Sequence, residues 1–542
     1  MRNKLFYISF LGIILLGAYL YFHKLDSIPS GFYIDEALPG YNAYSLLKTG
    51  KDEYGKSFPV ALRFLGFYNP PLYTYFTVPS VAFFGLTVFA TRFVAALTGL
   101  LLIVTTFLFL RLLKINKTSV LLGTLLFTIS PWVVLYSRLG DEVGLAFLFF
   151  CLGVLFSIWG LKRPALFALS IFFLSASSYT AYTERFLAPL YVIGFTLLFR
   201  KDLFSKIKKF ELIPAFAVGL ITQIPHLTIL FTPAFFPKKS LFSATVASQA
   251  EKIAHFLPMQ VSILLGFLRE FLANYIQYFS PGPLFFIPDP DLQRSMPELA
   301  VFYPWMAIPY LVGLYFLWKR RKEMIYRVLI MLMLISPLPA ALTRDPFASH
   351  RAFPLVLPII AITTLGIDKL IAGRQIKLWL SLAILLILGS LVLLWRSYFV
   401  FLPAERAKVW GYGFQQLAEE IKKRPNAHFL IERSRIKPAY VMLAFHLQYP
   451  PDKFQMETDK GIKDRYYTDL FFDDYYKFAN IETRNLDWGK DPLRAQIIVG
   501  DELAISPGQA KEHNLELVFE IRDPINYIVF RGWRTNPLEK LP

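Results

Sequence analysis

Long apolar runs recur along roughly the first 400 residues and are separated by short polar segments. Runs of about 17 to 25 apolar residues match the length that a helix needs to cross the hydrocarbon core of a bilayer. The pattern predicts about eleven membrane-spanning helices, at Leu5–Phe22, Ala90–Leu113, Ser119–Ser137, Val143–Leu161, Ala165–Tyr182, Phe186–Phe199, Leu212–Phe231, Ala300–Trp318, Val328–Leu342, Pro354–Leu370 and Leu378–Phe399.

The composition supports this prediction and excludes a soluble fold. Of the 542 residues, 55% are hydrophobic and 17% are aromatic, and the mean hydropathy is +0.45. That is more apolar surface than a soluble core can bury, so lipid must be the solvent for much of the chain. The first run follows Arg2 and Lys4, as in a signal peptide, but no small-x-small cleavage pattern follows it. We therefore interpret it as a retained first span.

The net charge of +18 comes from basic residues in short loops between the apolar runs. Such clusters mark the cytoplasmic side of a membrane protein and do not indicate a nucleic-acid partner. They predict a multi-pass plasma-membrane protein with its N-terminus in the cytoplasm and with residues 23–89, residues 232–299 and the C-terminal part outside. Within the second of these segments, Phe242–Phe256 and Val261–Phe279 are predicted as interfacial helices. The basic loops contain Lys114 and Lys117, Lys162 and Arg163, Arg200 to Lys209, Lys319 to Lys322, and Arg374 with Lys377.

After Val400 the apolar density falls and charged residues become frequent. This change predicts a soluble domain at residues 400–542, of ordinary domain size, after a membrane domain at residues 1–399. The predicted fold class is mostly α, a polytopic membrane helical bundle with a small C-terminal α/β domain. The domain's predicted elements are a helix at Glu405–Lys423 and strands at His428–Glu432, Ala495–Gly500, Leu515–Ile521 and Asn526–Phe530.

Two acidic residues stand together in the first outward segment. Asp35 and Glu36 follow the first span by about a dozen residues, so their carboxylates are expected near the outer membrane surface, where lipid headgroups lie. A positioned carboxylate there can take a proton from a hydroxyl group. The alternative is that Asp35 caps a helix that starts near Ala37, because aspartate is favoured at helix N-caps.

Two further outward loops combine acidic and basic residues. In the second outward loop, Arg138 is a candidate for binding phosphate, and Asp141 or Glu142 for orienting a ligand or Arg138 itself. The alternative there is an exposed ion pair and a helix start after Asp141.

The fifth outward loop contains Arg344, His350 and Arg351. Basic residues are expected mainly in the cytoplasmic loops, so two arginines in an outward loop are an exception. An anionic partner would explain the exception. The alternative is that the two arginines pair with Asp345 and with lipid headgroups.

The order of features near the N-terminus resembles that of a known enzyme family. A first span and the acidic pair are followed by NPPLYTY (Asn69–Tyr75) and FATRFVAALTG (Phe89–Gly99). This set is similar to the family 39-like GT-C membrane glycosyltransferases, which include protein O-mannosyltransferases and the aminoarabinose transferases that modify lipid A. The resemblance extends over about residues 20–370 and implies a GT-C fold and a polyprenyl-phosphate sugar as the donor.

The resemblance also implies roles for particular residues. Asp35 would be the general base, with Glu36 as its neighbour. In the aminoarabinose transferases a glutamate two places before the paired prolines takes part in a metal site, and here that position is Tyr68. No cofactor is therefore firmly implied, a divalent metal is doubtful, and the only cysteine, Cys151, lies in an apolar run. The remaining predicted site residues are Arg138, Arg344 and Arg351 for the donor phosphate, and Asp141, Glu142, Asn69 and His350 for orienting sugar or acceptor.

The predicted function is that of an inverting glycosyltransferase that acts on an acceptor outside the cytoplasm, whether protein, lipid or envelope glycan. An oligosaccharyltransferase-like enzyme, which moves a preassembled glycan from a lipid, is the first alternative. A transporter or flippase is the second alternative, but such proteins concentrate ionisable groups near the middle of their spans. Here the charged residues gather at span ends and in outer loops. The partners expected are the lipid-linked sugar and membrane lipids, with the acceptor left open.

Overall fold

The structure is a computed structural model that describes residues 3–64, 67–235, 244–343, 345, 347–372, 376–434, 439–458, 461, 465–468 and 475–537. The chain divides into two compact units. The membrane unit comprises Met1–His23, Ala95–Phe231 and Phe235–Ser397. The sheet unit comprises Lys24–Val94, Thr232–Ala234 and Tyr398–Pro542.

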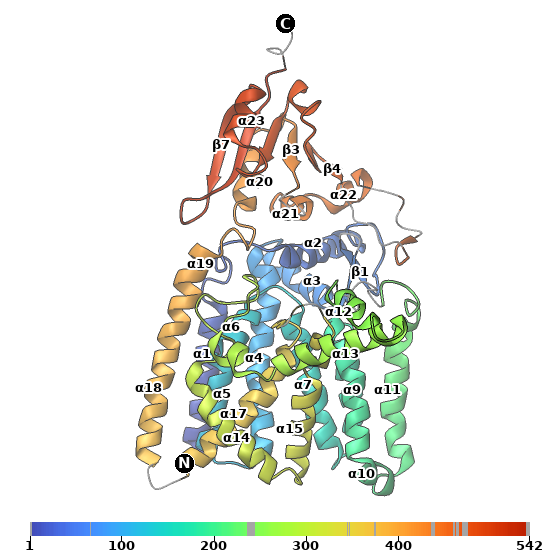
Figure 1. The fold of residues 1–542 in the computed structure, drawn as a ribbon, viewed down its shortest axis with the longest axis vertical. Helices are drawn as coiled ribbons and strands as arrows, with labels where there is room; N and C mark the ends of the chain where they lie inside the picture. The colour runs from blue at the N-terminus through green and yellow to red at the C-terminus, as the bar shows by residue number, and fades with distance from the viewer. Residues whose placement is uncertain are drawn as a thin grey trace. The chain divides into compact units, whose positions relative to one another are not determined.

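The membrane unit is a bundle of apolar helices, and Figure 1 shows its long helices running side by side. Helix α4 begins in the sheet unit and continues into this one. The helices are α1 (Asn3–Phe22), α4 (Val88–Leu112), α5 (Lys117–Ile129), α6 (Pro131–Tyr136), α7 (Val143–Gly160), α8 (Leu166–Ser178), α9 (Tyr182–Leu198), α10 (Arg200–Ser205), α11 (Lys209–Leu227), α12 (Ala244–Ala254), α13 (Met259–Gln277), α14 (Ala307–Lys319), α15 (Met324–Ile335), α16 (Leu338–Ala341), α17 (Val356–Ile371) and α18 (Ile376–Trp395).

The predicted fold class, a polytopic bundle of membrane helices, is confirmed. Among the described residues, seven helices are long and apolar enough to cross a membrane. Other predicted spans are shorter helices or are interrupted. The predicted span Ser119–Ser137 is two helices, because Pro131 begins α6 and cannot donate a hydrogen bond that would continue α5. Both predicted interfacial segments are helical, as α12 and α13, and Phe242 and Ser243 lie outside the described residues.

The sheet unit contains a six-stranded mixed sheet in the order β4-β5-β3-β6-β8-β7. Strand β3 pairs in parallel with β5 and β6, and the outer pairs are antiparallel. The strands are β3 (Phe429–Glu432), β4 (Tyr476–Phe478), β5 (Ile481–Arg484), β6 (Ile497–Gly500), β7 (Glu516–Arg522) and β8 (Ile528–Arg534), and a separate hairpin joins β1 (Leu62–Phe64) to β2 (Phe67–Asn69). The helices are α2 (Ile34–Thr49), α3 (Leu72–Phe84), α19 (Leu402–Glu405), α20 (Phe414–Lys422), α21 (Ala439–His446), α22 (Pro451–Glu457) and α23 (Pro507–Glu512).

Helix α2, which carries the acidic pair, shares the hydrophobic core of this sheet. Strand residues alternate between faces, so Ile431 lies in a core with Ala37 and Tyr41 of α2, whereas Leu430 packs with Trp533 on the opposite face. The segment between the first two predicted spans is therefore part of the same hydrophobic core as the C-terminal region. The prediction of two domains divided at residue 400 did not include this packing.

The helix predicted at Glu405–Lys423 is wrong over its first half. The structure has a short helix, α19, and then turns up to α20, which begins at Phe414. Gly411 and Gly413 have φ angles of 72° and 100°, a left-handed conformation that an α-helix does not contain. The amphipathic pattern continued through these glycines, and the pattern alone did not show that they turn the chain.

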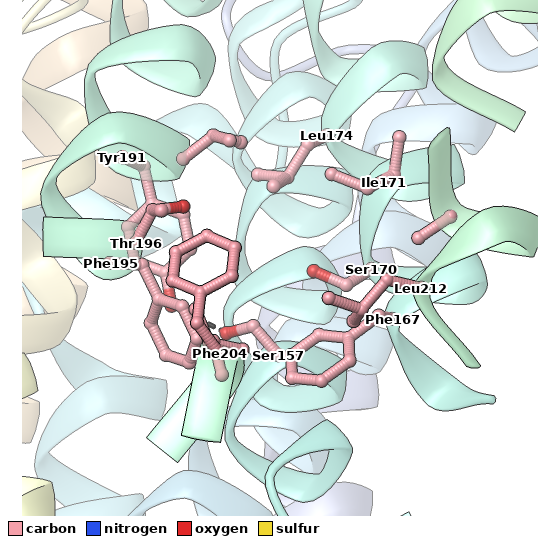
Figure 2. A pocket seen from close by; sticks show the side chains of 13 residues that line it. Ser157, Phe167, Ser170, Ile171, Leu174, Tyr191, Phe195, Thr196, Phe204 and Leu212 are labelled. Atoms are coloured by element: carbon pink, nitrogen blue, oxygen red, sulfur yellow. Dashed lines mark hydrogen bonds between the residues drawn. The ribbon is translucent and has the colours of Figure 1, made fainter. Parts of the chain in front are cut away.

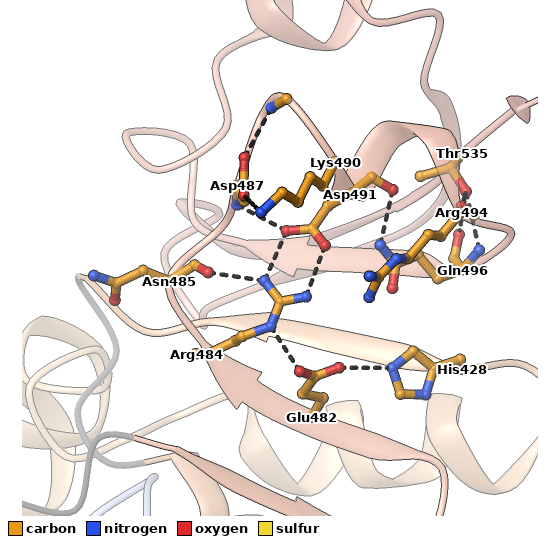
Figure 3. A network of polar contacts seen from close by, with 11 residues as sticks. His428, Glu482, Arg484, Asn485, Asp487, Lys490, Asp491, Arg494, Gln496 and Thr535 are labelled. Atoms are coloured by element: carbon orange, nitrogen blue, oxygen red, sulfur yellow. Dashed lines mark hydrogen bonds and ion pairs between the residues drawn. The ribbon is translucent and has the colours of Figure 1, made fainter.

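A polar network joins β5 to the residues that precede β3 and β6 (Figure 3). Arg484 makes two hydrogen bonds of 2.7 Å to the Asp491 carboxylate and one of 2.6 Å to Glu482, which also contacts His428 at 3.2 Å. These bonds tie β5 to the 3-10 turn at Asp491–Leu493. Because one guanidinium bridges two carboxylates within the network, we assign the network to the stability of the sheet.

Candidate functional site

The Asp35 side chain is exposed in the first turn of α2. Helix α2 begins at Ile34, and Tyr33 is its N-cap residue, in an extended conformation. The alternative that Asp35 caps a helix starting near Ala37 is therefore wrong. An acidic residue in the first helical turn is favourable, because the N-terminal end of a helix carries partial positive charge.

Glu36 is buried, with 1% of its surface exposed, and forms an ion pair with Arg92 of α4. The Arg92 Nε donates to Oε1 at 2.8 Å and Nη2 donates to Oε2 at 2.9 Å, a two-pronged arrangement. Oε2 also accepts the backbone N–H of Tyr33 at 3.2 Å. Glu36 thus holds the start of α2, and its neighbour Asp35 projects from a fixed turn.

Arg92 also fixes the backbone that leads into α2. It is fully buried, and its guanidinium donates to the carbonyl oxygens of Leu25 at 3.1 Å, Pro29 at 3.2 Å and Gly31 at 2.7 Å. One arginine thus satisfies three loop carbonyls and a carboxylate. Arg92 thus fixes the turn on which Asp35 lies. Arg92 belongs to the motif FATRFVAALTG, for which no separate role was predicted, although a charge inside an apolar helical run is expected to have buried partners.

A second buried polar cluster lies around the hairpin that carries Tyr68 and Asn69. The Tyr68 hydroxyl donates to the backbone oxygen of Tyr466 at 2.6 Å, beside the fully buried Arg63. Asn69 is half-buried and pairs with Leu62 across the hairpin. Tyr68, at the position where the resemblance implies a metal-site glutamate in the aminoarabinose transferases, thus makes a hydrogen bond to the backbone. Among the described residues, no group of three or more His, Cys, Asp or Glu side chains is placed to hold a metal ion.

Asp52 is the buried carboxylate of this cluster. It accepts the N–H of Tyr54 at 3.1 Å and of Lys56 at 2.8 Å, and the hydroxyl of Tyr466. Burial raises the pKa of Asp52 to about 6, and the hydrogen bonds from Tyr466, Lys56 and Tyr54 oppose the rise. The cluster therefore contains an acid that titrates well above its ordinary range of about 4.

This raised pKa predicts a pH dependence of stability. The folded protein binds the Asp52 proton up to about pH 6, whereas the unfolded chain releases it near the ordinary value of 3.8. The Asp52 contribution should therefore be most favourable below pH 4 and should fall by about 3 kcal/mol as the pH rises through 6. Thermal unfolding of the full chain in detergent from pH 4 to 7 measures this fall in stability.

In the Asp52→Asn variant, stability should lose the part of its pH dependence that comes from Asp52. In Asp26→Asn, at an exposed position before α2, stability should depend on pH as it does in the wild type. An Asp52→Asn protein with an unchanged slope would contradict the prediction.

In the membrane unit, Arg138 is fully buried and is bonded to the end of α1. Its Nη1 donates to the carbonyl oxygen of Leu20 at 2.6 Å and its Nη2 to that of His23 at 2.7 Å. These bonds satisfy carbonyl groups at a helix C-terminus. Asp141 and Glu142 are half-buried, and the Asp141 carboxylate accepts the N–H of Val143, the first residue of α7, at 3.1 Å. The structure thus shows the helix-start contact that was the alternative for Asp141.

The fifth outward loop brings Arg351 together with two residues of its own unit. The Asp345 carboxylate lies 3.0 Å from Nη1 of Arg294 and 3.7 Å from Nη1 of Arg351. No role was predicted for Arg294 from the sequence. The pairing of Arg351 with Asp345 was the alternative for this loop, and the structure shows it. Arg344 lies outside the described residues.

His350 lies next to these arginines and is neutral at physiological pH. Burial lowers its pKa well below 6.5, and the charges of Arg294 and Arg351 lower it further. Burial also lowers the pKa of Arg351, with a second contribution from Arg294. Two neighbouring arginines and a neutral imidazole can donate hydrogen bonds to an anion, with Asp345 as the internal competitor for the same donors.

No protein-family model matches the sequence, and no curated relative matches it. Comparison of the structure with solved structures finds ArnT from Cupriavidus metallidurans bound to undecaprenyl phosphate, with a TM-score of 0.57, 14% identity and coverage of 100% of both chains. The archaeal oligosaccharyltransferase AglB from Archaeoglobus fulgidus, in complex with an inhibitory peptide and a dolichol-phosphate, has a TM-score of 0.51 and 11% identity, over 100% of this chain and 75% of that chain. At these identities the likeness is one of fold, and it confirms the predicted GT-C-like fold.

Proposed function

We propose that this chain is an inverting glycosyltransferase that takes a sugar from a polyprenyl-phosphate donor and transfers it to an acceptor outside the cytoplasm. The observation that carries the proposal is the exposed Asp35 carboxylate, held at the start of α2 by the buried pair of Glu36 and Arg92. Its support is the fold that this chain shares with ArnT, a protein whose solved structure contains undecaprenyl phosphate. A fold by itself does not specify a function, so the residues carry the argument.

In the proposed reaction Asp35 acts as the general base. Its carboxylate takes the proton of an acceptor hydroxyl while the hydroxyl oxygen attacks the anomeric carbon of the sugar. The bond from that carbon to the phosphate oxygen breaks on the opposite face, so the configuration inverts and the lipid phosphate leaves with the bonding electrons. A phosphate leaving group needs cations and no second acid. Arg138, Arg344 and Arg351 keep the proposed role of phosphate ligands, and Asp141, Glu142, Asn69 and His350 that of orienting sugar or acceptor.

Transfer of a preassembled glycan is the second candidate, because the fold of AglB is also shared. The two functions differ in the donor that is consumed. We therefore expect the protein, reconstituted in phosphatidylglycerol vesicles with an envelope lipid and glycan extract as acceptor, to consume a radiolabelled polyprenyl-monophosphate sugar and to release polyprenyl phosphate. Thin-layer chromatography of the lipids measures both.

Consumption of a diphosphate-linked glycan alone would replace the proposal by oligosaccharyl transfer. Movement of the labelled lipid across the vesicle membrane without cleavage of its sugar would replace it by transport.

A further inference from the structure

The chain between α19 and α20 contacts the turn that carries Asp35. Residues 403–412, which begin in α19 and end before α20, belong with that turn to the sheet unit. The N–H of Tyr412 donates to the carbonyl oxygen of Ala407 at 3.0 Å, and Trp410 is 2% exposed. This stretch, which we name the 403–412 segment, therefore ends in a buried and hydrogen-bonded turn.

Gly31 lies directly against the backbone of the 403–412 segment. A Cβ atom at Gly31 would overlap the carbonyl group of Trp410 and would lie 2.7 Å from the backbone nitrogen of Tyr412. These obstacles are backbone atoms, which cannot rotate away as the end of a side chain can. Only glycine therefore permits this contact at position 31.

Gly411 makes the matching contact from the 403–412 segment. Its φ angle is 72°, and a Cβ atom there would lie 2.9 Å from the carbonyl oxygen of Phe32 and 3.1 Å from Cε of Met442. Residues other than glycine rarely adopt this conformation. The two stretches of backbone thus meet at a glycine on each side, and they lie closer together than side chains would allow.

The residues on either side of this contact bind the segment too. The Ser30 hydroxyl donates to the carbonyl oxygen of Pro403. The ring of Tyr33, the N-cap residue of α2, meets that of Trp410 edge to face, with 5.9 Å between the centroids. Every residue from 30 to 33 therefore contacts the 403–412 segment, and Asp35 follows two residues later.

Arg92 holds the same stretch of chain from α4. Its Nη2 donates to the carbonyl oxygen of Gly31 at 2.7 Å. Gly31 is thus held at its carbonyl oxygen by a guanidinium and at its Cα atom by the backbone of Trp410. These restraints act on different atoms, so disturbing the second should release the turn even with Arg92 in place.

We propose that the 403–412 segment belongs to the sugar-transfer site, because it positions Asp35 by fixing Gly31. This role rests on the proposed function, in which Asp35 is the base. Gly31, Ser30 and Trp410 are positioning residues, which act through the turn and touch no reacting atom. A base has to lie within hydrogen-bond reach of the hydroxyl that it deprotonates, so a shift of the turn by about 1 Å slows the reaction.

The Gly31→Ala variant tests this role, because its methyl group forces the turn away from Trp410. In reconstituted vesicles we expect kcat for sugar transfer to fall by roughly 10- to 100-fold, with an unchanged KM for the polyprenyl-phosphate sugar. In the Asp35→Asn background Gly31→Ala should cause no further loss of rate, because the segment acts through the Asp35 carboxylate.

A matched glycine control lies in β8 of the same unit. A Cβ atom at Gly532 would overlap the ring of Phe519, so Gly532→Ala should lower the unfolding temperature. Gly532 is not among the residues that touch the turn, so kcat should stay at the wild-type value. This control separates a loss of stability from a loss of position.

A milder variant guards against misfolding of Gly31→Ala. Ser30→Ala removes one hydrogen bond to the segment and should lower kcat by roughly 2- to 10-fold. Its control is Ser170→Ala: the Ser170 hydroxyl also donates to a backbone oxygen, that of Gly153 at 2.7 Å, beside a cavity of about 150 Å³ between α8, α9 and α11 (Figure 2). Ser170→Ala should transfer sugar at the wild-type rate.

A spin label reports the position of residue 35 without any transfer assay. The label is attached to an Asp35→Cys protein, in which the native Cys151 is buried and therefore protected from the reagent. We expect its electron paramagnetic resonance spectrum to show greater mobility when Gly31→Ala is added and no change when Gly532→Ala is added.

The proposal is overturned if folded Gly31→Ala keeps the wild-type kcat, if it slows Asp35→Asn by the same factor as the wild type, or if the spin-label spectrum does not change. Should Gly31→Ala fail to fold, a wild-type kcat in Ser30→Ala overturns it. A wild-type protein that transfers no sugar but gives the expected spectra would overturn the proposed function and would still support the positioning of residue 35.

Discussion

Replacing Asp35 by asparagine should lower the rate of sugar transfer by about 10²- to 10⁴-fold, the usual contribution of a positioned general base. The substitution keeps the shape of the side chain and removes its ability to accept a proton. Because Asp35 is exposed and Glu36 makes the buried contacts of this turn, the fold should be kept, and loss of the charge from the first helical turn should cost at most about 1 kcal/mol of stability. Initial rates with a radiolabelled polyprenyl-phosphate sugar in reconstituted vesicles measure the loss, and thermal unfolding checks the fold.

Asp26 provides the matched control for Asp35, because it is an exposed aspartate in the segment before α2. Asp26→Asn should transfer sugar at the rate of the wild type. Asp35→Glu, which keeps the carboxylate one methylene further out, should recover part of the lost rate. If Asp35→Asn transferred sugar at the wild-type rate with the same donor, Asp35 would not be the base, and the site would have to be sought elsewhere in the chain.

The membrane helices could be predicted from the sequence because each apolar run has to satisfy its backbone hydrogen bonds within itself. Their interruptions were harder to predict. Pro131 breaks the third predicted span, yet prolines such as Pro189 lie inside helices of the same bundle. Hydropathy measures how apolar a run is, and it does not show whether the neighbouring helices satisfy the groups that a proline releases.

The C-terminal region was predicted as α/β from four strand-like runs, and the sheet is present with six strands. Strands β4 (Tyr476–Phe478) and β5 (Ile481–Arg484) were missed because they contain no run of consecutive apolar residues. The equally short β3 and β6 each have such a run, and both were predicted. The packing of α2 into this sheet was also missed. It joins Tyr41 to residues about 400 positions later, and a single sequence contains no signal of such a contact.

The acidic pair was found from its position after the first span, but the different roles of its two members were not. Both residues are acidic and adjacent, and only the structure shows that Glu36 faces inward to Arg92 while Asp35 faces outward. The helical period separates the directions of adjacent side chains. Identification of the buried residue required the partner, which lies 56 positions later in the chain.

Removing the charge of Arg92 should destabilise the protein by about 3–5 kcal/mol, because the substitution leaves the Glu36 carboxylate buried without its counter-ion. Arg92→Met keeps much of the apolar volume and also releases the carbonyl groups of Leu25, Pro29 and Gly31. We therefore expect a marked drop in the unfolding temperature in detergent. In the fraction that remains folded, transfer should slow, because Asp35 would no longer project from a fixed turn.

The double variant Glu36→Gln with Arg92→Met distinguishes the effect of an unpaired buried charge from the effect of losing the bonds to the loop carbonyls. With both charges removed, the unfolding temperature should recover in part, because no unpaired charge is buried, while transfer should stay slow, because the loop carbonyls remain unbound. The control is Arg396→Met: Arg396 pairs with Glu298 at 3.2 Å, both side chains are about half exposed, and such a surface pair contributes little stability. Full recovery of transfer in the double variant would show that Arg92 serves only to neutralise Glu36, and that the three loop carbonyls do not position Asp35.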